Sequence, residues 1–300
     1  MSSPNTPLND SRWGSISHPK RVDPLWMTIG GPILRYGLLI ILSIIFLFPF
    51  YLMIRGALST KLEVNAADWV WWPEKAQWSN WNALFDDGKA NMALGLQNSA
   101  ALAIINLLLQ TLFASMAGYA LARIAVRGSG LVLSFILLTL MVPSAVTFVP
   151  TYVVLSKLGG VDTLWGIVVP GLFNAFATFL FRQFYLDFPK ELEEAGRIEG
   201  LSYLGVYFRL LLPNSLGIMA ALGVLSFISS WNAFLWPSIV SQSSDTRTVQ
   251  IVLSTFLTAQ TINLPALFMG AVVGAAPLVI VFLIMQRWIV QGVKMSGIKG

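Results

Sequence analysis

Acidic and basic side chains gather in one segment of this chain, between residues 187 and 213. The carboxylates of Glu191, Glu193 and Glu194 are followed there by the guanidinium of Arg197. Such groups make charge-assisted hydrogen bonds, which suit recognition of a polar partner. The chain has no cysteine, and its only histidine lies in the polar N-terminal stretch, so metal sites built on thiolate or imidazole are excluded. The segment is therefore a candidate for binding, and we expect no catalytic residue and no metal site.

The same segment has the pattern of two short helices joined at a glycine. Pro189 suits the first turn of a helix, where its missing N–H costs nothing, and the carboxylates that follow lie near the positive end of the helix dipole. Gly200 can end this helix in the left-handed conformation, and Ser202 can cap a second helix that ends near Pro213. A narrow apolar stripe at helical spacing comprises Leu192, Ala195 and Ile198. A short helix with a charged rim fits a groove of another protein, but the pair could equally do no more than connect two larger elements.

The rest of the chain is strongly apolar and predicts an all-α membrane protein. Of the 300 residues, 56% are hydrophobic and 11% are charged, against about 25% charged in an average soluble domain. The apolar residues form blocks long enough to cross the hydrocarbon core of a bilayer. We expect a polytopic bundle of about six transmembrane helices with a cytoplasmic loop at 187–213. The expected spans are 33–54, 97–121, 131–155, 164–181, 214–236 and 266–286.

The distribution of basic residues indicates the orientation. With both termini in the cytoplasm, thirteen of the 19 Lys and Arg residues lie on the inner side and six on the outer side. An excess of Lys and Arg marks the cytoplasmic side of a membrane protein. This explains the net charge of +5 without a nucleic-acid partner. We therefore expect a cytoplasmic tail at 1–31, a transmembrane domain at 32–290 and a cytoplasmic tail at 291–300, in a multi-pass protein of a bacterial inner membrane.

The predicted spans contain polar residues but no ionisable side chain in their interiors. Proton-coupled carriers need such groups within the membrane, so their absence argues against a proton-driven carrier, whereas a sodium-driven carrier stays open. The polar residues could line a pathway for a hydroxylated solute, or they could hydrogen-bond neighbouring helices together. The candidates for lining a pathway are Asn106, Gln110, Asn174 and Asn232.

Five tryptophans lie in the predicted outer segment between residues 55 and 96. They are Trp69, Trp71, Trp72, Trp78 and Trp81. Tryptophan favours the headgroup level of a membrane, so an interfacial belt or a small packed cap accounts for them. Tryptophan is also frequent where proteins bind one another, so a docking surface for an external partner is the alternative.

The 187–213 segment resembles the coupling loop of a known family. The integral membrane subunits of ATP-binding-cassette (ABC) importers carry the pattern E-A-A-x-x-x-G, nine residues, and I-x-L-P. This chain reads Glu194-Ala195-Gly196-Arg197-Ile198-Glu199-Gly200, nine residues, and Leu210-Leu211-Leu212-Pro213. Gly196 replaces the second alanine, and Leu210 replaces isoleucine. The resemblance covers about residues 30 to 300 and is to the carbohydrate-uptake, maltose-type branch, which also includes importers of glycerol phosphate.

The resemblance implies a set of partners and roles. In that family two permease chains form the pathway, two cytoplasmic ATPase subunits use ATP and Mg beneath them, and an extracytoplasmic binding protein delivers the solute. The coupling contact would comprise Glu194, Ala195, Gly196, Arg197, Gly200 and Pro213. Glu194 would offer its carboxylate across the interface, Ala195 and Gly200 would permit close approach, and Lys294 and Lys299 of the C-terminal tail could also reach the ATPases. The solute would be a sugar or an oligosaccharide, or alternatively glycerol phosphate.

The chain cannot supply the ATP site of such an importer by itself. It contains no Gly-x-x-x-x-Gly-Lys-Ser/Thr phosphate-binding loop, so it is expected to bind no cofactor and to be no enzyme. A secondary carrier, and a membrane scaffold or channel without energy coupling, are the other classes. The spacing of the loop favours the importer over both.

Overall fold

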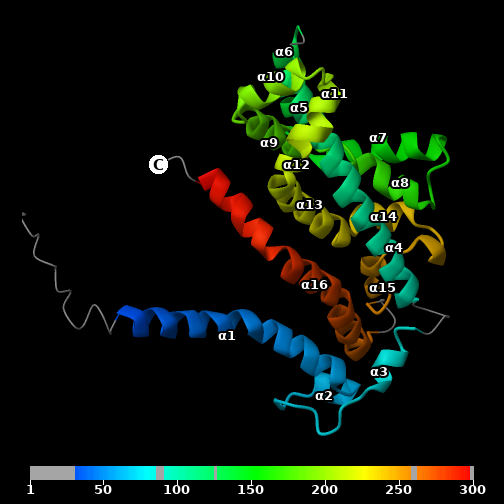
Figure 1. Cartoon of the computed structure of the whole chain (residues 1–300). Coiled ribbons are helices and arrows are strands. Elements are labelled where there is room, and N and C mark those ends of the chain that lie inside the picture. Colours follow the sequence, from blue (N-terminus) through cyan, green and yellow to red (C-terminus); the bar gives the residue numbers. More distant parts are fainter. Residues whose placement is uncertain (1–30, 86–90, 125–126, 258–261, 298–300) are drawn as a thin grey trace, which may run out of the picture. The chain divides into compact units, whose positions relative to one another are not determined.

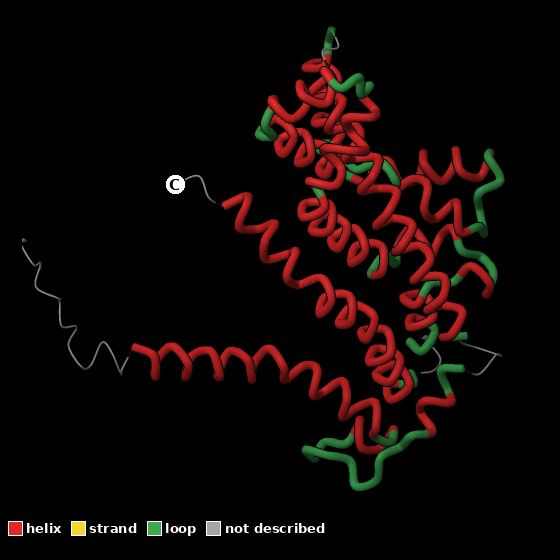
Figure 2. The backbone as a smooth tube through the Cα atoms, viewed as in Figure 1, coloured by secondary structure: helices red, strands yellow, loops and turns green. Residues whose placement is uncertain are grey.

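A computed structural model describes residues 31–85, 91–124, 127–257 and 262–297 of the chain, with the side chains of 31–33 and 287–297 left out. These residues are almost entirely helical, and their only β-type pairing is the isolated bridge between Leu257 and Ile262 (Figure 2). The chain divides into two units, Met1–Tyr51 and Leu52–Gly300. Of the predicted tail at 1–31 only Gly31 is described, and Lys299 and the side chain of Lys294 lie outside the described part.

The helices follow in order along the chain, with several short π and 3-10 segments between them (Figure 1). Their bounds are α1 Gly31–Leu58, α2 Lys61–Asn65, α3 Ser79–Asn82, α4 Met92–Ile105, η2 Asn106–Gln110, α5 Thr111–Arg123, α6 Ser129–Thr139, α7 Ser144–Lys157, α8 Leu164–Val168, η3 Val169–Gly171, α9 Ala175–Leu186, α10 Lys190–Ile198, α11 Tyr203–Val206, η4 Tyr207–Leu211, α12 Leu212–Asn214, α13 Leu216–Trp231, α14 Leu235–Val240, η5 Ser244–Thr246, α15 Val249–Ser254 and α16 Leu264–Gly297.

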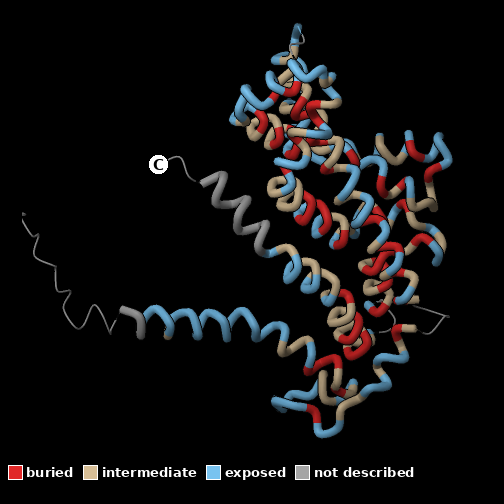
Figure 3. Tube along the Cα trace, viewed as in Figure 1, coloured by how far each residue is buried: buried red, intermediate tan, exposed pale blue. Residues whose placement is uncertain are grey.

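Three stretches of helix are long and apolar enough to cross a membrane. They are Leu34–Leu58, Met92–Arg123 and Leu264–Gln286, and they contain the first, second and sixth predicted spans. The side chains described in the N-terminal part of α1 are almost all exposed, as suits an apolar helix that meets lipid (Figure 3). The last helix runs on to Gly297, so the expected tail from 291 is helical over most of its length.

The third and fourth predicted spans each correspond to a bent pair of helices, whereas the fifth, 214–236, corresponds to α13 and the start of α14 and is preceded by a further bend. The pair Ser129–Thr139 and Ser144–Lys157 is bent by 98°, so the predicted segment 131–155 is not a straight helix but a broken span or a re-entrant loop. Pro143 caps α7 there, because proline lacks an N–H and disfavours helix at the residue before it. The pair Leu164–Gly171 and Ala175–Leu186 is bent by 46°, and Tyr203–Asn214 and Leu216–Trp231 by 78°. The described part therefore holds up to six spans if each pair is one.

Two buried clusters hold the second unit together. One cluster joins α4, α13, α15 and α16, and Trp231 at its centre donates its indole N–H to the Gly274 carbonyl at 3.0 Å. The other joins α5, α9 and η4 around the fully buried side chains of Phe181, Tyr185 and Tyr207. In this second cluster the Ser115 hydroxyl lies 2.7 Å from that of Tyr185 and accepts from Tyr207 at 3.0 Å. It supports the segment that carries α10 and α11, near the top of Figure 1.

Candidate functional site

The two short helices predicted at 187–213 are confirmed. The first is α10, which begins at Lys190, so Pro189 caps it rather than entering its first turn. It stops before Gly200, whose φ of +86° lies in the left-handed region that favours glycine. The Ser202 hydroxyl then accepts from Gly205 N–H at 3.2 Å and caps the second helical stretch. That stretch runs through a π-helical turn to Asn214, one residue beyond Pro213.

The apolar stripe of α10 faces outward. Leu192, Ala195 and Ile198 are exposed, with Ile198 exposed to 88%, whereas Glu193 and Gly196 face inward and are buried. The helix therefore directs Glu193 and Gly196 toward the body of the chain and leaves its apolar stripe exposed, together with its other charged residues. A surface helix usually buries its apolar side, and an apolar stripe that stays exposed is a surface of the kind that binds another protein.

Gly196 lies at a close contact between α10 and the second helical stretch. A Cβ atom there would lie 2.7 Å from Leu210 Cδ1 and 3.3 Å from Leu201 Cδ1. The residue thus supports the helix pair from within and does not face outward with Ala195. Gly200 has nothing within 4 Å of its Cβ position, so its role is in the backbone turn.

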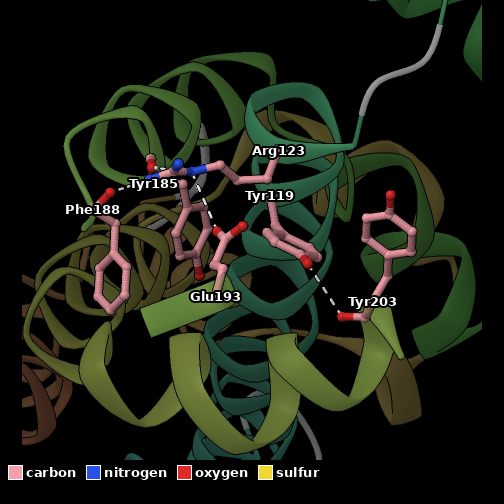
Figure 4. A network of polar contacts seen from close by, with 6 residues as sticks. All are labelled: Tyr119, Arg123, Tyr185, Phe188, Glu193 and Tyr203. Carbon is pink, nitrogen blue, oxygen red and sulfur yellow. Dashed lines mark hydrogen bonds and ion pairs between the residues drawn. The ribbon is translucent and has the colours of Figure 1, made fainter. Parts of the chain in front are cut away.

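A buried ion pair that the sequence analysis missed holds α10 in place. Arg123 is the last residue of α5, and its Nε lies 3.3 Å from Glu193 Oε1, with side chains exposed to only 5% and 9% (Figure 4). Arg123 Nε donates at 2.7 Å to the Tyr185 carbonyl, and its Nη2 donates to the Phe188 carbonyl. Since the Nε–H is directed at Tyr185, Glu193 Oε1 pairs with the charge without a hydrogen bond. One guanidinium therefore joins the ends of α5 and α9 to the first turn of α10.

The remaining predicted coupling residues lie around this contact. Glu194 and Arg197 line, with Arg123 and Glu193, a hollow of about 250 Å³. The Arg197 guanidinium stacks 4.1 Å from the centroid of the Tyr203 ring, linking α10 to α11. The signal for Arg123 was available in the sequence as a lone basic residue at the end of an apolar helix, but only the fold shows which carboxylate it meets.

A larger cavity of about 700 Å³ lies among α4, η2, α7, α9 and α13. Asn106, Gln110 and Asn174 line it, so three of the four candidate pathway residues are brought together. Asn232 does not line it. Its carboxamide oxygen accepts instead from Gln250 Nε2 at 3.4 Å.

The three cavity residues also make contacts within the chain. Asn106 Nδ2 donates to the Leu102 carbonyl and to Ser230 Oγ, and Gln110 Nε2 donates to the Gly171 carbonyl at 2.5 Å. Asn174 caps α9 by accepting from a backbone N–H. Hydrogen bonding between helices is thus part of what these residues do, and a role toward a solute stays a prediction.

The tryptophan-rich segment forms a small ordered cap beside the end of α1. Arg55 near the end of α1 is buried, its Nε donates to the Val70 carbonyl at 2.6 Å, and its guanidinium lies 4.5 Å from the Trp69 ring. The tryptophan side chains are 45% to 68% exposed. Both an interfacial belt and a docking surface are compatible with this exposure. No cluster of three or more metal-ligating side chains occurs among the described residues.

The side chain of Asp162 joins the loop before α8 to the loop between α14 and α15. Asp162 Oδ1 accepts from the backbone N–H groups of Gln242 and Ser243 and from the hydroxyls of Ser243 and Thr246, at 2.6 to 3.0 Å. These hydrogen bonds, that of Thr246 above all, lower the pKa of Asp162 to about 2. The carboxylate therefore stays ionised at any physiological pH.

Comparison with known proteins adds three findings. The sequence profile of the family described as "Binding-protein-dependent transport system inner membrane component" matches residues 110–295, more than half of the chain. The arabinooligosaccharides transport system permease protein AraQ of Halalkalibacterium halodurans is 33% identical over 90% of this chain and 98% of its own length. The sn-glycerol-3-phosphate transport system permease protein UgpE of Pectobacterium atrosepticum is 30% identical over 88% of this chain and 96% of its own length.

A solved structure shares the fold. A chain of a bacterial ABC transporter involved in the import of the acidic polysaccharide alginate superposes with a TM-score of 0.75, over 87% of this chain and 96% of that chain. The sequence identity of 20% makes this a likeness of fold alone.

Proposed function

Because the chain belongs to the family of inner-membrane components of binding-protein-dependent transport systems, we propose that it is the permease subunit of an ABC importer for a sugar or oligosaccharide. It would form the translocation pathway with a second permease chain in a bacterial inner membrane. An extracytoplasmic binding protein, as the family description implies, would deliver the solute.

The observation that supports coupling to an ATPase is the outward apolar face of α10. Ala195 and Ile198 are exposed on this helix, whose buried side carries Glu193 and Gly196, and the charged residues Glu194 and Arg197 are exposed beside them. A small apolar face with charged neighbours fits a groove of a partner, and the partner would cover the area that the fold leaves bare. We propose that two ATPase subunits with ATP and Mg provide such grooves, which puts α10 and both termini in the cytoplasm.

The choice of a carbohydrate rests on the relatives. AraQ, which is 33% identical to this chain, is named for arabinooligosaccharides. The match to UgpE favours glycerol phosphate as the second candidate, at a slightly lower identity.

Co-purification tests the proposed assembly. The tagged chain, extracted gently from native membranes, should bring down a soluble ATPase and a second multi-span subunit. Recovery of the chain alone, in a form that still transports, would refute the importer and restore the secondary carrier.

A matched pair of variants then tests the coupling surface. Asp and Asn are similar in size, and both tolerate positive φ better than most residues, so Gly200→Asp and Gly200→Asn differ mainly in charge. We expect Gly200→Asp to insert at normal abundance but to abolish uptake, with Gly200→Asn retaining more. Normal uptake by Gly200→Asp at normal abundance would overturn the coupling assignment.

A further inference from the structure

The cavity beside η2 has the lining of a site for an uncharged, hydroxylated ligand. Of its 21 described lining residues, nine carry a hydroxyl or carboxamide, three are aromatic, and none is ionisable. Its volume of about 700 Å³ falls within the range of roughly 300 to 1,000 Å³ of small-molecule sites. A phosphate or carboxylate would lose its hydration here without meeting a cation, whereas a neutral polyol would find partners for its hydroxyls.

Two residues that line the cavity each hold a buried polar atom with no hydrogen-bond partner among the described residues. The atoms are Asn106 Oδ1 and Ser226 Oγ, and Ser226 is exposed to only 8%. The carboxamide of Asn106 is fixed in orientation, because its Nδ2 donates to the Leu102 carbonyl at 3.1 Å and to Ser230 Oγ at 3.0 Å. Ser226 lies one helical turn before Ser230 on α13. An unpaired buried polar atom is costly and rare, so a ligand that pairs with both atoms explains them.

The backbone of the wall is irregular at the same place. Asn106 and Gln110 are the first and last residues of the π-helical turn η2, which interrupts an otherwise regular stretch of helix from α4 to α5. Such π turns occur frequently at functional sites. Hydrogen bonding between helices gives Asn106 Nδ2 a partner, but it accounts neither for the unpaired Asn106 Oδ1 and Ser226 Oγ nor for the π turn.

An aromatic pair completes the lining. Phe148 and Trp236 meet edge to face, with ring centroids 5.4 Å apart, and Trp236 Nε1 donates to the Gly166 carbonyl at 3.2 Å. The rings are thus held in place and only partly buried. The negative face of an aromatic ring attracts the slightly positive C–H groups on the apolar face of a sugar ring.

We propose that this cavity is a binding subsite for one ring of a neutral carbohydrate within this chain. Sugar hydroxyls donate to Asn106 Oδ1 and pair with Ser226 Oγ, and the apolar face of the ring lies against Phe148 and Trp236. The proposal rests on the proposed function, and it adds that the solute passing this chain carries no charge.

Two buried hydroxyls without a hydrogen-bond partner among the described residues, those of Ser226 and Thr248, provide a matched test. Thr248 Oγ1 is also buried without a partner, but Thr248 does not line the cavity. The complete importer, with its binding protein in proteoliposomes, is assayed for initial uptake of tritiated neutral oligosaccharides (arabinotriose, lactose and maltotriose). We expect Ser226→Ala to slow uptake of the transported sugar by roughly threefold to tenfold, the loss of one hydrogen bond, and Thr248→Val to leave it unchanged. If both hydroxyls were only structural, neither change would slow uptake.

A second pair of variants tests Asn106 without altering it. A Cβ at Gly171 would meet only Asn106 Oδ1, at 3.7 Å, whereas a Cβ at Gly217 would meet nothing within 4 Å. Gly171→Ala therefore covers the unpaired oxygen without a clash, and we expect it to slow sugar uptake, with Gly217→Ala as the control. Both variants are tolerable sterically, so a loss of uptake at equal abundance reports on the cavity.

The outcomes separate the subsite from the proposed function. Uptake of a neutral sugar that neither Ser226→Ala nor Gly171→Ala slows would overturn the subsite and leave the sugar importer standing. Uptake of glycerol 3-phosphate or of an oligouronate, with no neutral sugar carried, would overturn the uncharged subsite. No ATP-dependent uptake of any of these solutes by the complete importer would overturn the proposed function itself.

Discussion

Replacement of Arg123 by methionine should loosen α10 more than any change on its exposed face. The Nε–Oε1 distance of 3.3 Å corresponds to a gross attraction of about 5 kcal/mol at an effective dielectric constant of 20. Desolvation opposes this attraction, but removal of one partner leaves the other charge buried, which typically costs about 3 to 5 kcal/mol. Arg123→Met also removes the donors to the Tyr185 and Phe188 carbonyls.

Hydrogen exchange of the α10 amides, measured by mass spectrometry on the purified importer, reports this loss locally. Each loss of about 1.4 kcal/mol from the free energy of local opening speeds exchange tenfold. A loss of about 3 to 5 kcal/mol should therefore accelerate exchange of the α10 amides by about a hundredfold to a few thousandfold. Glu191 is exposed in the first turn of α10, so Glu191→Gln is a control that removes an exposed charge from α10 itself, the same charge that Glu193 carries. It should leave exchange almost unchanged.

A double variant separates the ion pair from the carbonyl bonds. Replacement of a buried pair by apolar residues of similar size is often nearly neutral, so Arg123→Met with Glu193→Met should exchange more slowly than Arg123→Met alone. The reasoning is refuted if Arg123→Met leaves α10 protected, since α10 would then be held by the packing around Gly196. It is also refuted if the double variant exchanges as fast as the single one.

Three further predictions concern two residues of α10 and the hydrogen bonds of Asp162. Arg197→Glu should reduce recovery of the ATPase in co-purification, and Tyr203→Leu, which removes only the stacked ring, should reduce it less; undiminished recovery with Arg197→Glu would contradict the docking role. Gly196→Ala should preserve transport, because the added Cβ would meet the flexible end of the Leu210 side chain at 2.7 Å, and alanine favours the helix by about 1 kcal/mol. A loss of uptake would show that the Leu210 side chain cannot move aside. The pKa of Asp162 is lowered from 3.8 to about 2, so the stability that its carboxylate contributes is complete above about pH 4 and is lost as the pH falls through 2. Protection of the 242–246 amides, corrected for intrinsic exchange, should therefore be constant from pH 5 to 8. The same protection should fall in Asp162→Asn.

The coupling segment was predictable because its signals are local. Proline before a helix, carboxylates in its first turn, a glycine at positive φ and a serine cap all act within a few residues, and the structure contains each of them. The direction of α10 was not predictable, because its apolar stripe by itself would be placed inward. That direction depends on Arg123, which is 70 residues away in the sequence and holds Glu193 beneath the helix.

The membrane spans show the same division between local and distant causes. The long hydrophobic blocks of the sequence predicted the positions of α1, of the α4–α5 stretch and of α16. The 98° bend after Thr139 exceeds the kink that Pro143 alone suggests, because a bend of that size also depends on what each half packs against. Likewise, Asn106 and Asn232 look alike in sequence, but only the packing of α13 places the first in the cavity and the second outside it.

The outward face of α10 also bears on how the importer is assembled in the cell. A chain that has inserted but has not met the proposed ATPase would display Ile198 and Leu192 to the cytosol, where chaperones and proteases recognise exposed apolar segments. The surface that we propose joins the subunits would thus mark an orphan subunit for removal. The abundance of the permease would then follow the supply of its ATPase, which would keep the stoichiometry of the complex without control of the transcription of each gene.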